Sequence, residues 1–196
     1  ITNDHTPTFD VEIDSPYFRV YRDGAMISGG FENGPTYTCD VQPDGTWDYT
    51  VTAVDAAGNE SSASPALNVT IDTLAPTATV DLKDASDTGY SSTDNITSDN
   101  TPTFDFVGAT EFQFYRDGIP LMPGFVAGSS YTAATLADGS YYYTVLVKDI
   151  AGNSSAISNA MLVTIDTTAP TATLDLQDAS DTGISSTVNI PNDNTP

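Results

Sequence analysis

The sequence predicts an all-β fold of tandem two-sheet sandwiches, and three observations support this prediction. The segment Ile1–Asp10 returns as Ile96–Asp105 and begins again at Ile190, so a unit of roughly 95 residues repeats along the chain. Short runs rich in Val, Thr, Tyr and Phe alternate with Asp-Gly, Gly-Asn and Pro turn signals. No stretch of the sequence shows a helical period. About six or seven short strands per unit are typical of an immunoglobulin-like β-sandwich.

The strand pattern also predicts which side chains face the core. In the first unit Trp47 and Tyr49 alternate with Asp48 and Thr50, and a carboxylate does not face a core unpaired. The Trp47 face therefore points inward, and a slip of one residue would expose it. We expect Trp47 and its counterpart Tyr141 to be buried anchors between the sheets. The predicted core positions are Trp47, Tyr49, Val51, Ala53, Leu67, Val69 and Ile71 in the first unit and Tyr141, Tyr143, Val145, Val147, Met161, Val163 and Ile165 in the second.

Two copies of the motif Asp-Thr-x-Ala-Pro, which end at Pro76 and Pro170, mark the joints between units. Pro cannot lie inside a sheet ladder and gives a stiff connection, so we predict short stiff linkers here. The predicted domains are a first repeat at residues 1–73, a complete second repeat at 74–168 and the start of a third repeat at 169–196. A unit of about 95 residues is large enough to bury a core without disulfides.

If each unit begins after its Pro, the first strand of the second repeat is Thr77–Leu82. The first repeat then lacks its first strand, and Thr171–Leu176 is an orphan first strand at the far end. An open sheet edge accepts an added strand, so we expect this tail to complete a neighbouring molecule, head to tail. The predicted partners are this neighbouring molecule and the adjacent repeats of the same chain.

The charge excludes several partners. The chain has 27 acidic and 5 basic residues and a formal net charge of −22, and 23 of the acidic residues are Asp. Such a surface repels nucleic acid and anionic membranes, and no apolar run approaches the ~18 residues that span a bilayer. Asp rather than Glu is typical of turns and of calcium loops. The alternative is a solvated acidic surface, as in a salt-loving organism. Because no signal peptide is present, we expect an internal segment of a longer protein.

Catalysis is not expected. Cys39 and His5 are the only residues of their types, so neither a disulfide nor a zinc-binding His pair can form within the chain. His5 falls where the other copies carry Asn100 and Asn194. The sequence has no nucleophile elbow and no phosphate-binding Gly loop. Paired carboxylates leave a glycosidase open on residue type alone, but two small sandwiches offer no obvious deep cleft. We therefore predict a protein that is not an enzyme.

The loop after the predicted strand Thr77–Leu82 is the first candidate calcium site. Its motif Asp-Ala-Ser-Asp-Thr-Gly places two carboxylates three residues apart, with a Gly to turn the chain. Calcium binds six to eight oxygen ligands, which a loop of this kind can supply, although the spacing is not that of an EF-hand. The alternative is a loop whose Asp side chains cap turns. The candidate ligands are Asp84, Asp87, Asp94 and Asp99.

The second candidate site lies at the ends of the repeats. Asp55 and Asp149 belong to Asp-x-Ala-Gly-Asn turns, and Asp72 and Asp166 lie at the joints, so the four can meet across a domain end. Carboxylates crowded at a joint repel one another, and Ca²⁺ would convert this repulsion into a crosslink that restricts the hinge. For Asp55 and Asp149 the alternative is a hairpin turn closed by its own Asp.

The third copy departs from this pattern. Val188 replaces Asp94, whereas Asp178 and Asp181 remain. We expect weaker calcium binding there, or none.

The motifs of the chain resemble the Ig-like repeats of very long bacterial surface adhesins of the repeats-in-toxin (RTX) and biofilm-associated type. The resemblance covers the whole chain and rests on Asp-Thr-Thr-Ala-Pro-Thr-Ala-Thr from Asp166, Asp-Ala-Ser-Asp-Thr-Gly from Asp84 and Asn-Asp-Asn-Thr-Pro from Asn192. It implies an extracellular stalk on the bacterial cell surface that carries a binding domain away from the cell, and repeats that bind calcium near their joints and stiffen with it.

Two other functions remain open. The repeats could form a ligand- or glycan-binding module for cell-cell or surface attachment, with stacking surfaces from Tyr17, Tyr90, Tyr131 or Tyr142. Tyr is also common on strands, so these residues alone do not decide. A spacer should repeat its surface, whereas a binding module should carry a cluster unique to one copy. Tyr142 and Leu146 of the second unit provide such a contrast, because the equivalent positions of the first unit hold Asp48 and Thr52. The repeats could also mediate assembly between cells.

Overall fold

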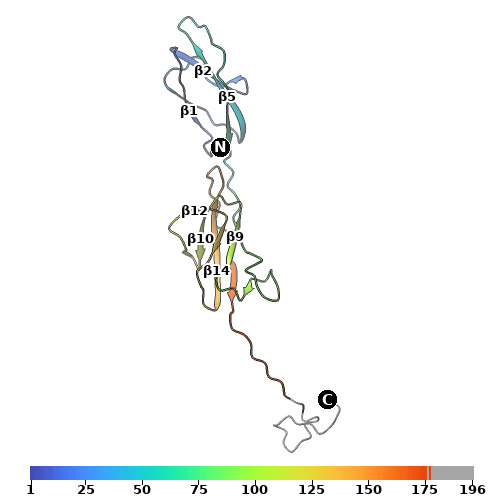
Figure 1. Ribbon diagram of the computed structural model, residues 1–196. Helices are drawn as coiled ribbons and strands as arrows, with labels where there is room; N and C mark the ends of the chain where they lie inside the picture. Colours follow the sequence, from blue (N-terminus) through green and yellow to red (C-terminus); the bar gives the residue numbers. More distant parts are fainter. Residues whose placement is uncertain (176, 178–196) are drawn as a thin grey trace, which may run out of the picture. The chain divides into compact units, whose positions relative to one another are not determined.

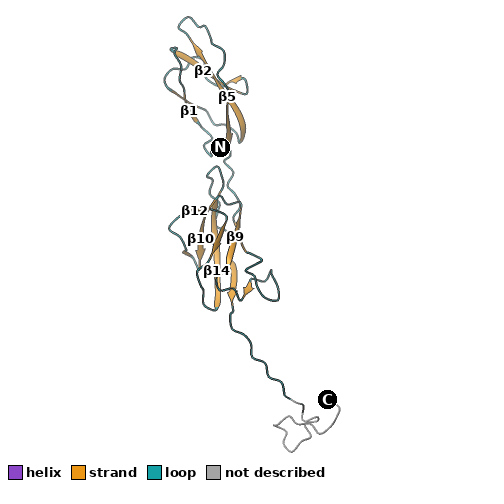
Figure 2. Ribbon diagram, in the orientation of Figure 1, coloured by secondary structure: helices purple, strands orange, loops and turns teal. Residues whose placement is uncertain are grey.

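The computed structural model describes residues 1–175 and 177, and its regular elements there are all strands (Figures 1 and 2). The strands of the first repeat are β1 (Thr8–Asp10), β2 (Tyr17–Arg22), β3 (Ala25–Met26), β4 (Thr36–Thr38), β5 (Gly45–Val54) and β6 (Leu67–Ile71). Those of the second repeat are β7 (Thr79–Leu82), β8 (Ile96–Thr97), β9 (Thr103–Val107), β10 (Glu111–Arg116), β11 (Ile119–Pro120), β12 (Val126–Ala127), β13 (Ser130–Thr132), β14 (Gly139–Lys148) and β15 (Met161–Ile165). Within this described part, no helix is long and apolar enough to cross a membrane.

Each repeat consists of two sheets. In the first repeat β1 pairs with β4, and the second sheet has the order β3-β2-β5-β6. In the second repeat the three-stranded sheet has the order β13-β9-β7, and the larger sheet has the order β11-β10-β14-β15-β8, with β12 also paired to β10. All of these pairings are antiparallel except β15 with β8. The all-β sandwich predicted from the sequence is therefore confirmed.

Local sequence sets the hairpins. The motif Tyr-Arg-Asp-Gly closes both the β2–β3 and the β10–β11 hairpin with a two-residue loop. In the first repeat, Arg22 pairs with Ala25 on either side of this loop. Asp23 and Gly24 have φ angles of 47° and 79°, and the corresponding residues of the second repeat have nearly the same values. Positive φ at both loop positions gives the turn twist that matches twisted strands, and Asp-Gly tolerates it best.

The core of the second repeat confirms the predicted inward face. Tyr143, Val145 and Val147 of β14 are fully buried, as is Val163 of β15. They pack against the aromatic side chains of β9 and β10, whose ring centroids lie 4.5–5.0 Å apart where β9 meets β10. The alternating pattern of β14 thus predicted these buried positions correctly, because successive side chains of a strand point to opposite faces of the sheet.

The two predicted anchors between the sheets are wrong. Trp47 and Tyr141 are half-buried at the start of their strands rather than buried between the sheets. Each ring lies beneath an arginine: Arg22 is 4.5 Å from the Trp47 ring centroid, and Arg116 is 5.3 Å from that of Tyr141. Their polar atoms donate hydrogen bonds to loop carbonyls, so the rings cap the rim of the sandwich, where an amphipathic side chain is favoured.

The first repeat has a smaller core. Leu67, predicted to be inside, is 55% exposed, and Val51 and Val69 are only half-buried. The buried cluster around Phe18 contains Val11 and Val20, compared with the twelve buried residues of the second cluster. In the second repeat, β7 pairs with β9 and covers part of the core. In residues 1–73, β1 pairs with β4 alone, so the corresponding part of the core stays open.

The chain reaches and leaves the second repeat at opposite ends of β14. Thr77 lies beside Gly108, since a Cβ added to Gly108 would be 3.7 Å from the carbonyl oxygen of Thr77. Gly108 comes shortly before Glu111, which pairs with Lys148 at the end of β14. At the other end of β14, Gly139 pairs with Ile165, the last residue of β15. β14 has 10 residues, so these ends are roughly 30 Å apart at ~3.3 Å per residue.

The core makes a direct prediction. Phe114 is fully buried, and its ring centroid lies 4.9–5.5 Å from those of Phe104, Phe106, Tyr131 and Tyr143. Replacing it with alanine should cost about 3–5 kcal/mol of unfolding free energy, since it removes transfer energy and leaves a cavity. Urea denaturation followed by circular dichroism should show an earlier transition for the second repeat.

The chain contains its own control for this experiment. Its single tryptophan, Trp47, lies in the first repeat, so tryptophan fluorescence reports that repeat alone and should be unchanged in Phe114→Ala. Ile119→Ala, at a position that is 68% exposed, should change the stability by less than about 0.5 kcal/mol. Equal effects of the two substitutions would contradict the core assignment.

Candidate metal-binding site

The acidic loop between β7 and β8 begins with a tight turn. The backbone N–H groups of Ser86 and Asp87 both donate to the carbonyl oxygen of Lys83, at 2.7 and 3.0 Å. This turn follows β7 directly and directs the next residues inward, so that Ser86 and Asp87 are buried. Asp84, on the outer side of the same turn, is exposed.

Asp87 is the unusual residue of this loop. Only 4% of it is exposed, and its Oδ2 accepts a hydrogen bond of 3.2 Å from the backbone N–H of Asn95. Its Oδ1 is buried and has no hydrogen-bond partner among the described residues. A buried carboxylate oxygen without a partner is costly, because the charge has lost its water and gained no donor or cation in exchange. Of the predicted ligands in this loop, Asp87 is therefore the one with a buried carboxylate oxygen that lacks a partner.

Neutral oxygens surround the same turn. Thr97 donates its hydroxyl to the carbonyl oxygen of Ser86, and the Thr97 and Thr88 hydroxyl oxygens are 2.9 Å apart. Thr88 Oγ1 is also 3.0 Å from the hydroxyl of Ser98. Hydroxyl and carbonyl oxygens are hard ligands of the kind that Ca²⁺ prefers. These oxygens are of the type that a hard cation prefers, and in this structure they are hydrogen-bonded to one another.

The other predicted ligands of this loop point elsewhere. Asp94 is exposed and accepts a hydrogen bond of 3.1 Å from the backbone N–H of Ile96. Partial burial works to raise the pKa of Asp99, but hydrogen bonds from Thr101 and Ser86 outweigh it and lower that pKa below its usual value. Over residues 1–175 and 177, no three acidic, His or Cys side chains gather closely enough to hold a metal ion.

The loop lies at the end of the second repeat where the chain leaves it. The carbonyl oxygen of Asn95 accepts a hydrogen bond of 2.9 Å from the N–H of Thr164, and the carbonyl oxygen of Thr97 accepts one of 2.9 Å from the N–H of Asp166. Strand β8 also pairs in parallel with the end of β15, with Thr97 opposite Ile165. A cation bound at Asp87 would therefore lie close to the joint that begins at Asp166.

The turns at Asp55 and Asp149 are closed by their own carboxylates. Asp55 Oδ1 accepts from the backbone N–H groups of Ala57 and Asn59, at 2.9 and 2.8 Å, and Asp149 makes the same pattern with Ala151 and Asn153. The side-chain hydrogen bond from Asn59 is the main cause of a lowered pKa at Asp55. At Asp149 burial works to raise the pKa, but the hydrogen bonds from Asn153 and its neighbours outweigh it and lower the pKa. The turn-closing role left open above is present in both repeats.

The four aspartates predicted to meet across a domain end are divided by the fold. Strand β5 runs from Gly45, opposite Ile71, to Val54, so Asp55 and Asp72 lie at opposite ends of one sheet. Asp149 and Asp166 are separated by β14 in the same way.

One contact across the joint does form. Asn153 Nδ2, in the Asp149 turn, donates a hydrogen bond of 2.8 Å to the carbonyl oxygen of Asp72. The structure therefore brings Asp72 to the Asp149 turn and leaves Asp55 and Asp166 apart from them. Asp178 and Asp181, of the third copy, lie outside the described residues.

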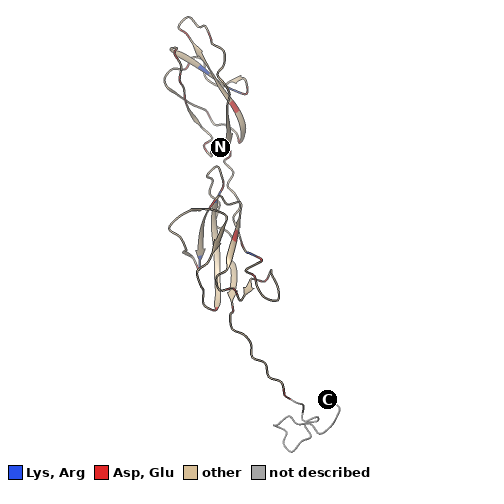
Figure 3. Cartoon of the chain, viewed as in Figure 1, with Lys and Arg blue, Asp and Glu red and all other residues tan. Residues whose placement is uncertain are grey.

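The sequence did not single out Ser86 and Thr97 as parts of this site. Both are buried polar residues in contact with the Asp87 turn, because Ser86 supplies its carbonyl oxygen and Thr97 its hydroxyl. Strand β8, in which Ile96 is exposed and Thr97 is buried, directs Thr97 toward this turn. Figure 3 shows why charge alone could not locate the site, since acidic residues also lie on strands such as β5 and β9.

Paired β-sheets repeated in tandem, with Asp-closed turns at their ends, define a modular Ig-like protein. The chain matches the sequence profile described as "Bacterial Ig-like domain" over residues 1–73 and 74–116, which is more than half of its length. The chain belongs to this family.

Two relatives show where similar segments occur. The chain is 39% identical over 145 residues to Chitinase A1 of Niallia circulans, which covers 71% of the chain and 18% of the relative. It is 35% identical over 131 residues to Exoglucanase B of Cellulomonas fimi, which covers 62% of the chain and 12% of the relative. The chain thus spans less than a fifth of either relative.

Among solved structures, the chain is similar to the fibronectin(III)-like modules of Clostridium thermocellum CbhA. The identity is 16% and the TM-score 0.43, with 79% of the chain and 81% of that structure covered. At this TM-score the likeness carries no argument about function.

The Asp149 turn predicts a pH dependence. Replacing Asp149 with alanine should lower the unfolding free energy of the second repeat by about 1 kcal/mol at pH 7, as for loss of an Asp cap. Because the pKa of Asp149 is lowered on folding, its stabilisation is present above the unfolded pKa of about 3.9 and is lost as the pH falls through the folded pKa. Urea denaturation between pH 2 and 7 should show the two proteins converging at low pH.

The exposed Asp84 provides the control in the same repeat. Asp84→Ala, measured in chelator, should change the stability at pH 7 by less than about 0.5 kcal/mol. A constant difference between wild type and Asp149→Ala over the whole pH range would contradict a role of the ionised carboxylate in the turn.

Proposed function

We propose that the chain is a non-catalytic spacer of a large extracellular bacterial protein, stiffened by calcium, as in the stalk of a cell-surface adhesin. The observation that carries this proposal is the path of the chain through the second repeat, which begins and ends at opposite ends of β14. Each added repeat of this kind lengthens the protein by roughly the length of its long strands, about 30 Å. Tandem copies of such a unit are suited to separating the domains on either side.

The relatives support a non-catalytic role. Segments like this chain occur in two proteins named for different activities, a chitinase and an exoglucanase, and form 18% and 12% of them. A module shared by enzymes of different specificity is best explained as common architecture rather than as the source of either activity. Both names refer to enzymes of polymers too large to enter a cell, which favours an extracellular location.

Calcium is proposed because of the buried oxygen of Asp87. A divalent ion there would compensate the carboxylate, and the neutral oxygens around the same turn, the carbonyl of Ser86 and the hydroxyls of Thr88 and Thr97, are of the type that Ca²⁺ prefers. The loop is hydrogen-bonded to the last strand and to Asp166, so an ion would tie it to the end of the repeat that adjoins the next joint. Extracellular calcium modules bind at about 10⁻⁴ to 10⁻³ M, so the site would fill outside a cell and empty inside it.

Calcium should stabilise the second repeat. At 10 mM Ca²⁺ and a dissociation constant of 10⁻⁴ to 10⁻³ M, its unfolding free energy should rise by about 1.4–2.7 kcal/mol. Asp87→Asn should remove this gain, because the variant lacks the buried negative charge. The gain is measured by urea denaturation in calcium and in excess chelator, followed by circular dichroism.

The controls separate specific binding from general screening. Asp40→Asn removes one exposed acidic charge from the first repeat and should keep the full calcium gain. Magnesium at the same concentration should stabilise less, since it demands a smaller octahedral site. In small-angle scattering, chelation should broaden the distance distribution of wild type and leave that of Asp87→Asn unchanged. A calcium gain that survives in Asp87→Asn would overturn the assignment of the site.

A glycan-binding module is the second candidate, and one surface favours it. Tyr142 is 56% exposed and lies opposite Leu162 across β14 and β15, whereas the same positions of the first repeat hold Asp48 and Asn68. This apolar pair is thus particular to one copy. The spacer proposal predicts no retention on insoluble chitin or cellulose in a pull-down assay. Retention that is lost in Tyr142→Ala would establish the glycan-binding role instead.

A further inference from the structure

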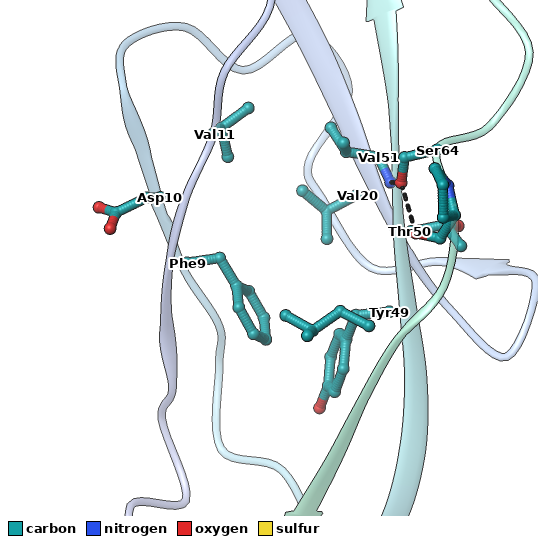
Figure 4. A pocket seen from close by; sticks show the side chains of 10 residues that line it. Phe9, Asp10, Val11, Val20, Tyr49, Thr50, Val51 and Ser64 are labelled. Carbon is teal, nitrogen blue, oxygen red and sulfur yellow. Dashed lines mark hydrogen bonds between the residues drawn. The ribbon is translucent and has the colours of Figure 1, made fainter.

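The loop between β3 and β4 is fixed to the core of the first repeat at two points. On one side Glu32 exchanges backbone hydrogen bonds of 3.0 Å with Phe18. On the other side the carbonyl oxygen of Pro35 accepts a hydrogen bond of 2.7 Å from the N–H of Val11. Phe18 and Val11 belong to the buried cluster of this repeat, and Figure 4 shows the Val11 side chain directed into the space between the two sheets. Only residues 33 and 34 lie between these fixed points.

Asn33 and Gly34 are exposed, and their polar groups are unpaired. Among the residues that the structure describes, neither the Asn33 amide nor the N–H of Gly34 has a hydrogen-bond partner. Gly34 has a φ of 102°, and a Cβ added to it would meet no atom within 4 Å. Water therefore reaches both residues, and no neighbour holds the Asn33 side chain away from the backbone nitrogen that follows it.

The second repeat has the same loop without the amide. The corresponding residues are Ala127 and Gly128, and Gly128 has a φ of 131°. The carbonyl oxygen of Ser129 accepts a hydrogen bond of 2.8 Å from the N–H of Phe106, so the second fixed point is present as well. Here, however, the N–H of Gly128 donates a hydrogen bond of 2.9 Å to the carbonyl oxygen of Thr110. The loop thus requires a glycine, for its positive φ, but not an asparagine before it.

An asparagine followed by a glycine can react with its own backbone. Asn33 is the only asparagine of the sequence that precedes a glycine, whose missing Cβ leaves its nitrogen open to approach. Attack of the Gly34 nitrogen on Cγ of Asn33 forms a C–N bond and closes a succinimide ring. The bond from Cγ to Nδ2 breaks, and Nδ2 leaves as ammonia with the proton of the Gly34 N–H. Water then opens the ring at either carbonyl carbon, which gives aspartate or isoaspartate.

We propose that Asn33–Gly34 is a site of self-modification, at which the folded chain converts Asn33 into aspartate and isoaspartate with water as the only co-reactant. The reaction is intramolecular, so it depends on local geometry and not on an enzyme. The folded loop permits it because the attacking nitrogen is unpaired and the amide is free to turn toward it. The second repeat lacks the amide and stays unmodified at this loop. The proposal does not rest on calcium or on the spacer role.

The two products affect the first repeat differently. Aspartate adds a negative charge at an exposed position and leaves the backbone unchanged. Isoaspartate directs the backbone through the former side chain, so it adds a methylene between Glu32 and Pro35, which are both held by the core. The hydrogen bond from Val11 to Pro35 should weaken, because β4 begins at the next residue, Thr36. The urea transition of aged protein, followed by the fluorescence of Trp47, should therefore shift to lower urea.

Isoaspartate labelling and mass spectrometry of the full chain test the proposal. The native protein is incubated for days at 37 °C and then treated with an isoaspartate methyltransferase and a labelled methyl donor. Trypsin places Asn33 in the peptide of residues 23–83, because Arg22 and Lys83 precede its two cleavage points. We expect the label in this peptide, together with a mass gain of about one dalton at Asn33 where a hydroxyl replaces the amino group.

The chain supplies matched controls. Asn33→Ala copies Ala127 of the second repeat, so it should fold with the same urea transition of Trp47 as fresh wild type and lose the label from this peptide. Asn33→Gln keeps the amide but adds a methylene, so ring closure should be slower by about tenfold or more. Asn59 lies in the same peptide, and its amide donates a hydrogen bond of 2.7 Å to Asp55, so it should react far more slowly than Asn33.

The outcomes separate the proposal from its alternatives. Equal label in Asn33→Ala and wild type would overturn the assignment of the site, as would conversion of Asn59 as fast as that of Asn33. The incubation is repeated in urea to measure the reaction of the unfolded chain. Conversion in buffer within about tenfold of the rate in urea supports the role of the folded loop. Slower conversion in buffer would overturn that role, because the fold would then hold the two groups apart.

Discussion

The packing of β7 against β9 and β14 is the contact on which the rest of this structure depends. Leu82 closes the core over Phe104, and Phe104 in turn contacts Phe114 and Tyr143 at 5.0 and 4.5 Å between ring centroids. Burial of several aromatic rings at this one place supplies a large share of the apolar area removed from water. In residues 1–73, where β1 pairs with β4 alone, the buried cluster around Phe18 is smaller.

The position of β7 at the start of the repeat has two consequences. The joint at Pro76 lies directly before β7, and the acidic loop begins directly after β7, at Lys83. The loop then crosses to β8, which pairs with the last strand, so Asp87 is fixed at the end where the chain leaves. Closure of the core, the direction of the chain and the candidate cation site thus arise from one segment of about twenty residues.

The sequence predicted the fold well because its signals were local or repeated. Asp-Gly turns fixed two hairpins, and the polar face of β5 gave the phase of β14, where Tyr143, Val145 and Val147 are buried as expected. Leu67 was predicted wrongly because its burial requires a strand that residues 1–73 do not provide. Trp47 was predicted wrongly because it lies at a strand end, where a ring beneath Arg22 is satisfied at the rim.

The candidate site was harder to predict for a related reason. Asp84, Asp87 and Asp94 look alike in sequence, and only the fold distinguishes the one that is buried from the two that are exposed. Asp87 is buried by the turn at Lys83, and its carboxylate accepts a hydrogen bond from the backbone N–H of Asn95. Non-local burial of this kind is not encoded in residue spacing.

Amide hydrogen exchange of the full chain tests the importance of the closing strand most directly. If that strand holds the sandwich together, the amides of β14 should exchange only by global unfolding, whereas those of β5 should exchange far faster by local opening. Equal protection of β5 and β14 would contradict this account.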